Sequence, residues 1–408
     1  MNMINVRRLA VMTFLGAGML SDISAQDFSV QADTLNEARL PAQWDLQSCI
    51  DYALEQNITI RKNRVTAEST QIDVKTAKAA LFPSLSFSTS QQVVNRPYQE
   101  TSSRVSGSEI ISSNSKTSYN GNYGLNASWT IYNGSKRLKT LKQERLNNQV
   151  AELDVATSEN TIKESIAQIY IQILYAAESV RVNENTLQVS IAQRDRGQEL
   201  LNAGSIAKSD FAQLEAQVST DRYQLVTAQA TLQDYKLQLK QLLELDGENE
   251  INVYLPSLSH ENVLAPLPAK KDVYVSALAI RPEIEASKLN VEASELGIDI
   301  AKSSYFPTIS LSAGIGTNHT SGSDFTFGEQ VKNGWNNSIG LSVSVPIFNN
   351  RQTKSAVQKA KLQRETNMLS LLDEQKALYK TIESLWLDAN SAQQRYAAAN
   401  EKLRSTQI

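Results

Sequence analysis

Three segments of the chain alternate between apolar and polar residues with a period of two, which is typical of a β-strand with one apolar face. These segments are residues 119–131, 309–315 and 339–345, and Leu85 and Phe87 begin a fourth. Each is roughly the 9 to 11 residues with which a tilted strand crosses a bilayer. A soluble sheet that packs on one face has the same pattern, so alternation alone leaves both structures open.

The polar positions of these segments would form the second face of such a sheet. If the strands cross a membrane, their apolar side chains face lipid and their polar side chains face a lumen. The residues that we expect to face a lumen are Asn126, Ser128, Thr130, Ser310, Ser312, Ser342 and Ser344.

Two long stretches without proline, residues 134–246 and 350–408, have a different period. Their apolar residues recur at alternating steps of four and three, as in Ile162, Ile166 and Ile169, which is the heptad spacing of coiled coils. A helix from about Ser135 to Asn202 would be about 100 Å long at 1.5 Å per residue, far longer than a globular helix. Such a helix needs a partner alongside it.

The first stretch contains one strong signal for a turn. Gly204 can adopt the left-handed conformation that ends a helix, and Ser209 or Asp210 can cap the next one. We expect a helical hairpin whose tip exposes Ile206, with polar Ser205 beside it, as a small apolar knob for a partner coiled coil. A well-capped turn without any partner would have the same residues.

The chain is an internal duplication. Residues 80–88 and 304–312 have nearly the same pattern, and their prolines, Pro83 and Pro307, are 224 positions apart. Further along, residues 129–134 align with 345–350 at an offset of 216, so the loop between the two motifs is eight residues shorter in the second copy. Copies of this size are larger than the stacking units of solenoids. Each copy is therefore expected to form a large half of one architecture.

The first 25 residues have the pattern of a cleavable secretory signal. Arg7 and Arg8 precede an apolar run that is too short to span a bilayer, and Ser24 and Ala25 end the segment. Cys49 is the only cysteine of the chain, which excludes an intramolecular disulfide and disfavours a lipid anchor directly after the signal. The formal net charge of −3 gives no sign of nucleic-acid binding.

Polar loops and the number of strands favour a membrane barrel that is shared between chains. Residues 98–118 and 317–335 are rich in small polar residues and resemble the long outer loops of such barrels. Four strands are too few to close a barrel, and an open edge in lipid leaves backbone groups unpaired at several kcal/mol each. Several chains would have to contribute, with the long helices forming a second tube beneath the strands.

Taken together, these motifs resemble the TolC-type outer-membrane efflux channels over essentially everything after the signal. The likeness rests on residues 44–46 leading to 53–57, on the matching Arg281-Pro282-Glu283 of the second copy, on the two Phe-Pro segments, and on the strand ends at 131–134 and 346–349. Each motif is weak alone. Their order, duplication and spacing make the match specific.

The resemblance implies a mainly α-helical fold with a small β part. Each protomer would have internally duplicated coiled-coil hairpins and four membrane strands, and three protomers would form a twelve-stranded barrel in the outer membrane above a periplasmic α-helical barrel. The implied function is the passive channel of a tripartite efflux or type I secretion system, without catalysis or cofactor. The implied partners are two further copies, outer-membrane lipid, a periplasmic adaptor (membrane fusion) protein and an inner-membrane pump.

In that family the hairpin tip meets the adaptor through a glycine that is followed five residues later by Thr or Ser and then Asp. The matching residues here are Gly204, Ser205, Ile206, Ser209 and Asp210. The expected organisation is a signal peptide (1–25), an N-terminal linker (26–43), a first repeat (44–246), an inter-repeat linker (247–268) and an incomplete second repeat (269–408).

The second repeat is expected to be incomplete because the counterpart of Gly204 would lie beyond Ile408. The chain would then be a fragment, a truncated reading frame or an inactive paralogue, with an apolar stripe on residues 357–403 that lacks its partner.

Other classes of function have weaker support in the sequence. The two histidines, His260 in an expected linker and His319 in an expected outer loop, have no cysteine nearby, so neither a metal site nor catalysis is expected. A periplasmic coiled-coil adaptor or scaffold would share the long helices but not the duplicated strands. A self-contained porin would need more strands in each chain.

Overall fold

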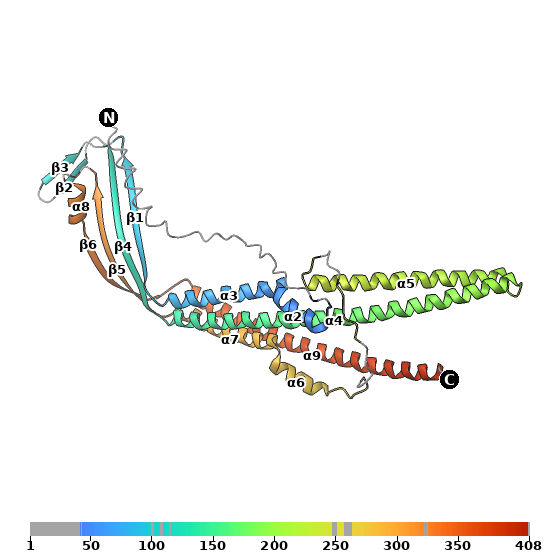
Figure 1. Cartoon of the computed structure of the whole chain (residues 1–408). Helices are drawn as coiled ribbons and strands as arrows, with labels where there is room; N and C mark the ends of the chain where they lie inside the picture. Colours follow the sequence, from blue (N-terminus) through green and yellow to red (C-terminus); the bar gives the residue numbers. More distant parts are fainter. Residues whose placement is uncertain are drawn as a thin grey trace.

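The computed structural model describes residues 41, 43–98, 102–106, 109–113, 116–246, 251–256, 263–321, 323 and 325–406. The expected signal peptide, nearly all of the expected N-terminal linker, and His260 lie outside these residues. The molecule is elongated, with a β-sheet at one end and a two-helix hairpin at the other (Figure 1). The expected mainly helical fold with a small β part is confirmed.

The duplication is visible in the helices that precede the sheet. In the first copy, α2 (Leu46–Gln56) has 11 residues and α3 (Ile58–Ala79) has 22. In the second copy, α6 (Lys270–Ile280) has 11 and α7 (Pro282–Ser303) has 22. Because these helices have equal lengths, the first strand of each repeat begins at the same distance from the start of its repeat.

Four strands form one antiparallel sheet in the order β1-β4-β5-β6. They are β1 (Ser84–Asn95), β4 (Thr117–Asn133), β5 (Thr308–Thr320) and β6 (Asn336–Ser344). Each copy supplies two neighbouring strands, and the copies meet where β4 pairs with β5. With 17 residues in β4 and 13 in β5, two strands are longer than the alternation predicted, because backbone pairing continues into polar sequence.

The expected polar loops contain regular structure. Within residues 98–118, β2 (Ser102–Ser106) and β3 (Glu109–Ser113) form an antiparallel hairpin. Within residues 317–335 the chain completes β5 and then forms a short helix, α8 (Phe327–Asn333). Glu329 and Thr326 cap α8 reciprocally: the Glu329 carboxylate accepts from the Thr326 N–H at 2.8 Å, and the Thr326 hydroxyl accepts from the Glu329 N–H at 3.4 Å.

Three long helices form the body of the molecule: α4 (Lys136–Asn202), α5 (Lys208–Leu242) and α9 (Gln352–Thr406). Near the sheet α4 packs against α3 and α7, and farther away it packs against α5 (Figure 1). With 67 residues, α4 is about 100 Å long. Packing against a different neighbour at each level stabilises a helix of this length.

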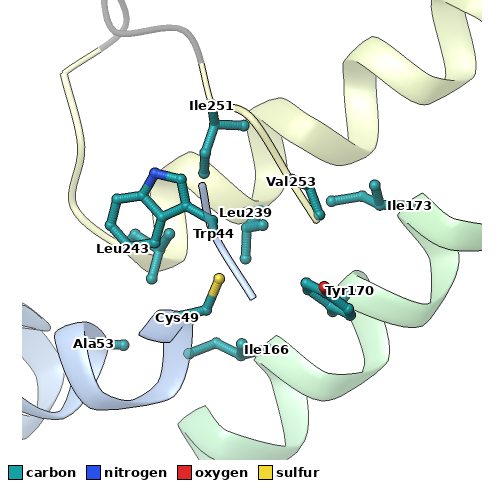
Figure 2. Packing of buried hydrophobic residues seen from close by; sticks show 10 residues of the cluster. All are labelled: Trp44, Cys49, Ala53, Ile166, Tyr170, Ile173, Leu239, Leu243, Ile251 and Val253. Carbon is teal, nitrogen blue, oxygen red and sulfur yellow. The ribbon is translucent and has the colours of Figure 1, made fainter. Parts of the chain in front are cut away.

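A compact hydrophobic core fixes the start of the first repeat to the long hairpin (Figure 2). The Trp44 backbone pairs with residues 252 and 254 through hydrogen bonds of 2.8 Å in both directions. The Tyr170 hydroxyl on α4 donates to the carbonyl of Tyr254 at 2.6 Å. The buried members of the core are Trp44, Cys49, Ala53, Ile166, Tyr170, Ile173, Leu239, Leu243, Ile251 and Val253. The core thus joins α2, α4, the end of α5 and the segment at 251–253.

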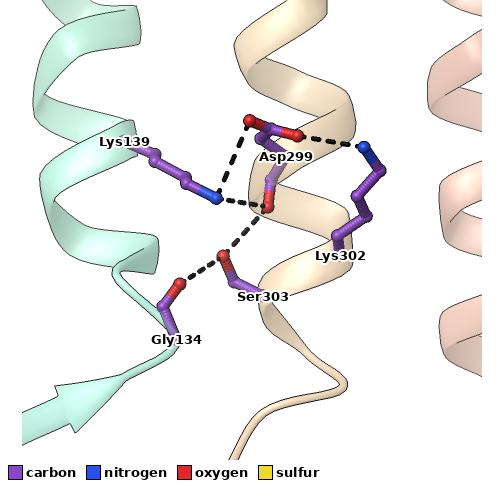
Figure 3. A network of polar contacts seen from close by, with 5 residues as sticks. All are labelled: Gly134, Lys139, Asp299, Lys302 and Ser303. Atoms are coloured by element: carbon purple, nitrogen blue, oxygen red, sulfur yellow. Dashed lines mark hydrogen bonds and ion pairs between the residues drawn. The ribbon is translucent and has the colours of Figure 1, made fainter.

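The two repeats are also joined where β4 turns into α4 (Figure 3). The Ser303 hydroxyl contacts the carbonyl of Gly134 at 2.8 Å and that of Asp299 at 2.9 Å. The Asp299 carboxylate pairs with Lys302 at 3.2 Å and with Lys139 of α4 at 3.8 Å. The strand-to-helix turn of one copy is therefore fixed to the last turn of α7 in the other.

Candidate functional site

The sheet has two chemically different faces, which its register defines. Residues that pair directly across antiparallel strands point to the same face. Ser128 pairs with Ser312, which pairs with Gly340, and Thr130 pairs with Ser310, which pairs with Ser342. By the same register Asn126 and Ser344 belong to this face. All seven expected lumen residues therefore share one face of the sheet, and whether that face borders a lumen stays a prediction.

Side-chain hydrogen bonds confirm that this face is polar across neighbouring strands. The hydroxyls of Ser84 and Ser128 lie 2.8 Å apart. The Asn126 amide donates to the Ser88 hydroxyl at 3.3 Å. At Gly314 an added Cβ would come within 3.0 Å of the Ser338 hydroxyl, so small residues keep this face shallow. The face offers hydroxyl and amide groups and no charged group in these rows.

The opposite face is apolar, and its rows near the helices and in the middle are exposed. Its exposed large side chains include Leu85, Phe87, Leu125, Trp129, Ile315, Ile339, Leu341 and Val343, and Ile339 is 79% exposed. An apolar face of this extent is costly in water, at about 25 cal/mol per Å² of apolar surface. In lipid the same face is favourable.

The alternation in β4 breaks at one position. The register shifts between Thr130 and Tyr132, so that Tyr132 rather than Ile131 pairs with Ile309. Ile131 is the extra residue of this bulge and has no direct partner in the register, so its place in the apolar row stays a prediction. A bulge of this kind lets the strand bend as it approaches the helices.

The hairpin tip is closed by a glycine-dependent turn. Gly204 has φ +71°. Its N–H donates to the carbonyl of Leu201 at 2.9 Å, and the Ser205 N–H donates to that of Leu200 at 2.8 Å. This pair of bonds is the Schellman arrangement that ends a helix. The expected role of Gly204 in the turn is confirmed, and a Cβ there would have open space around it.

Of the two residues expected to cap α5, only Asp210 takes part in the cap, and the expectation of an exposed apolar knob is wrong. The N-cap of α5 is Ala207, so Ser209 lies in the first helical turn and does not cap it. Asp210 contributes from the third helical position, where its carboxylate accepts from the Ala207 N–H at 3.4 Å. Ile206 is half-buried between the two helices rather than an exposed knob. Gly204 and Ser205 are exposed at the tip, as are their neighbours at 202–203 and 207–210.

Two features inside the hairpin have no signal in the sequence. Gly197 is buried because α4 and α5 approach closely there: an added Cβ would meet the Leu214 methyl at 2.4 Å. Farther from the tip, Asp221 is buried and accepts hydrogen bonds from Ser190 and, at 2.9 Å, from Gln217. In the sequence Asp221 looks like one more charged position on a solvated helix, and only tertiary packing reveals its burial.

His319 lies in β5 and not in a loop, which corrects the sequence-based expectation. In the described part of the chain, no group of three or more His, Cys, Asp or Glu side chains is arranged to hold a metal ion. None of the helices in the described ranges combines the length and the apolar character needed to cross a membrane.

The fold and the two-faced sheet define a duplicated helical protomer that carries a small amphipathic sheet. The chain belongs to the outer membrane efflux protein family, which it matches over residues 49–244 and 273–408. The expected family assignment is thereby confirmed.

Curated relatives and solved structures agree with this assignment. The chain is 25% identical over 252 residues to the outer membrane efflux protein BepC of Brucella suis, covering 61% of this chain and 52% of BepC. It is 23% identical over 361 residues to the cation efflux system protein CusC of Escherichia coli O157:H7, covering 87% of this chain and 74% of CusC. The structure of the outer membrane protein VceC from Vibrio cholerae has the same fold, with a TM-score of 0.69, 18% identity, and coverage of 89% of this chain and 82% of VceC. The match thus spans about half of BepC and about three quarters of CusC.

Proposed function

We propose that this chain is one protomer of a passive exit duct through the outer membrane and the periplasm. The observation that carries the proposal is the register of the sheet, which places the small polar residues of β4, β5 and β6 on one face and most of the large apolar residues on the other. With lipid outside and water inside, both faces are in a favourable environment. Family membership supports the same assignment.

The free edges of the sheet support assembly with further copies. The outermost strands are β1 and β6, each of which is paired on one side only within the described sheet. In hydrocarbon, unpaired backbone groups cost several kcal/mol each, so β6 of one protomer should pair with β1 of the next. Three protomers would supply twelve strands, within the range known for closed barrels.

The assembly is tested by the native mass of the complex extracted from outer membranes. We expect a homotrimer in the outer-membrane fraction. A monomer, or a protein that fractionates with soluble periplasmic proteins, would contradict the duct.

We propose further that the hairpin tip docks a periplasmic adaptor protein, which links the duct to an inner-membrane pump. The tip is farthest from the sheet (Figure 1). Gly204 and Ser205 are exposed there, while Ile206 is only partly exposed and lines a groove with Leu200 and Leu214. Docking would therefore depend on close approach to a small, rigid turn rather than on insertion of an apolar knob.

A bulky residue at Ser205 tests docking without straining the backbone, because Ser205 is not in the left-handed region. We expect Ser205→Trp to abolish efflux in a drug-susceptibility assay while the trimer stays intact. Ser219→Trp, at an exposed position farther along α5, is the matched control and should retain efflux. Normal resistance with Ser205→Trp would contradict docking at the tip but leave the duct itself standing.

A further inference from the structure

The apolar face of the sheet changes character along the strands. Near the helices and in the middle, its rows consist mostly of aliphatic or aromatic residues, such as the pair Trp129 and Leu311 and the pair Leu125 and Ile315; Asn337, beside Ile315 on β6, is polar. One row farther, Tyr123 pairs with Thr317. The aliphatic band therefore ends between these two rows, and amphipathic side chains follow it.

The amphipathic end is a packed cluster centred on His319. Its ring lies 5.1 Å from the ring of Tyr119 and 6.0 Å from that of Tyr123, measured between centroids. It covers Gly121, where an added Cβ would meet the His319 ring at 2.3 Å. The Tyr119 hydroxyl donates to the side chain of Gln91 on β1. Rings that carry polar groups and pack on an apolar face are typical of the boundary between lipid and water.

Helix α8 packs onto this same face of the sheet. The Phe327 ring meets the His319 ring edge-on, with centroids 5.0 Å apart. The Thr317 hydroxyl donates to the carbonyl of Val331 at 2.7 Å. The Thr320 N–H donates to the Gln330 side chain at 2.8 Å. Because Thr317 and His319 belong to the apolar face, α8 lies on the lipid side of the sheet and not over its polar side.

Large aromatic side chains at both ends of α8 remain exposed. Phe325 precedes the helix and is 52% exposed, and Trp335 follows it and is 57% exposed. Trp335 comes directly before β6, at a position in phase with Ile339 of the apolar face. The helix itself carries one acidic and one basic exposed residue, Glu329 and Lys332. It therefore combines aromatic ends with a charged, solvated surface.

We propose that α8, with Phe325 and Trp335, is a lipid-contacting collar at the boundary between headgroups and acyl chains, on the outside of the barrel. This inference rests on the proposed function. The occupant of the surface is the lipid bilayer: Phe325 and Trp335 lie at the level of the acyl boundary, and Glu329 and Lys332 lie among the headgroups. The collar marks the depth at which the sheet stops crossing hydrocarbon.

Depth measurement by spin labelling tests the collar in the full chain reconstituted into phosphatidylcholine vesicles. A nitroxide is attached to Phe325→Cys or Trp335→Cys, each of which keeps the other aromatic residue. Cys49 needs no replacement, because it is buried and desolvation raises the pKa of its thiol to about 12. The ratio of collisions with oxygen to collisions with a water-soluble nickel chelate reports the depth of each label.

Two further labels calibrate the measurement. Ile339→Cys reports the apolar band, and Ser338→Cys reports the polar face. We expect ratios at 325 and 335 between these two limits. If the ratios at 325 and 335 are as low as at 338 while 339 is high, the collar is overturned and the duct stands. The same conclusion follows if the ratios at 325 and 335 are as high as at 339. A low ratio at 339 as well would overturn the duct itself.

A variant experiment supplies an independent readout. Replacing both Phe325 and Trp335 with Asn should lower the fraction of reconstituted protein that resists extraction from vesicles by alkaline carbonate, by severalfold. Gly328→Asn, on the same helix and in open space, is the control and should leave that fraction unchanged. Equal extraction of the double variant and the control would contradict a role of the aromatic pair in lipid contact.

Discussion

The two repeats have helices of the same length but begin them with different chemistry. In the first repeat, Asp45 caps α2 and Asn57 caps α3 with side-chain hydrogen bonds. The second repeat has Ala269 and Arg281 at these positions, without a side-chain cap, and Pro282 at the first helical position of α7. The capping of the helix starts thus differs between the copies, although the helix lengths are the same. Burial of the helix faces, rather than the caps, determines where each helix lies.

The strand-to-helix turns have the same backbone conformation in both copies, but only the first copy requires glycine. Both copies place two consecutive residues in the left-handed region: Gly134 and Ser135 in the first, Asn350 and Arg351 in the second. Asparagine tolerates this conformation, so glycine is not required by φ alone. In the first copy, however, a Cβ on residue 134 would lie 2.7 Å from the carbonyl oxygen of Ser303. There, close packing between the repeats requires glycine.

The largest effect is expected from Gly134→Ala, because the clashing atom belongs to the backbone and the φ of +66° is itself unfavourable for alanine. Strain of this kind costs on the order of 1–3 kcal/mol, and the loss of the hydrogen bond from Ser303 would add to it. Asn350→Ala is the matched change in the second repeat and should cost less. Thermal unfolding in detergent, followed by helical circular dichroism at one scan rate, compares them. Equal shifts would show that the two turns are equivalent.

A medium effect is expected from Asn57→Ala. The Asn57 side chain is buried, accepts from the Thr59 N–H at 2.9 Å and donates to the carbonyl of Leu242 at 3.1 Å. Losing an N-cap typically costs about 1 kcal/mol, and leaving a partly buried carbonyl unpaired adds to that.

The matched substitution, Arg281→Ala, removes a partly exposed ion pair with Glu283 and should cost about 0–1 kcal/mol. The same unfolding assay ranks the two variants. A larger effect at Arg281 would show that its guanidinium has a structural role beyond the ion pair.

Much of this architecture follows from the sequence because duplication provides an internal check. The offset of 224 that relates Pro83 to Pro307 also relates the starts and ends of α2 and α3 to those of α6 and α7. The two-faced strands and the hairpin turn at Gly204 follow from simple periodicity and from one glycine.

The parts that could not be predicted depend on tertiary contacts or on short signals. Helix α8 has seven residues, too few for an apolar period, although its Thr326 and Glu329 form a capping signal. The bulge before Tyr132 arises from pairing with β5, which local alternation does not report. At the tip, α5 begins at Lys208 with Ala207 as its N-cap, so Ser209 is a suitable capping residue by type but lies inside the first helical turn.

The smallest effect is expected at Asp45, whose counterpart in the second repeat has no cap. The Asp45 carboxylate accepts from the Ser48 N–H at 2.7 Å, and its hydrogen bonds with Ser48 lower its pKa below the ordinary value of 3.8. Because the folded-state pKa is lowered, the stabilisation is complete above about pH 4 and is lost as the pH falls through the lowered value. Asp45→Asn keeps a capping side chain that does not titrate. We therefore expect the unfolding midpoints of the natural chain and the Asn variant to agree near pH 7 and to diverge as the pH falls below the ordinary pKa of 3.8, with the natural chain less stable. Other carboxylates titrate in both proteins and cancel in the difference. A difference that does not change with pH would show that the charge on Asp45 contributes nothing to the start of α2, and the first repeat would then begin as the second one does, by packing alone.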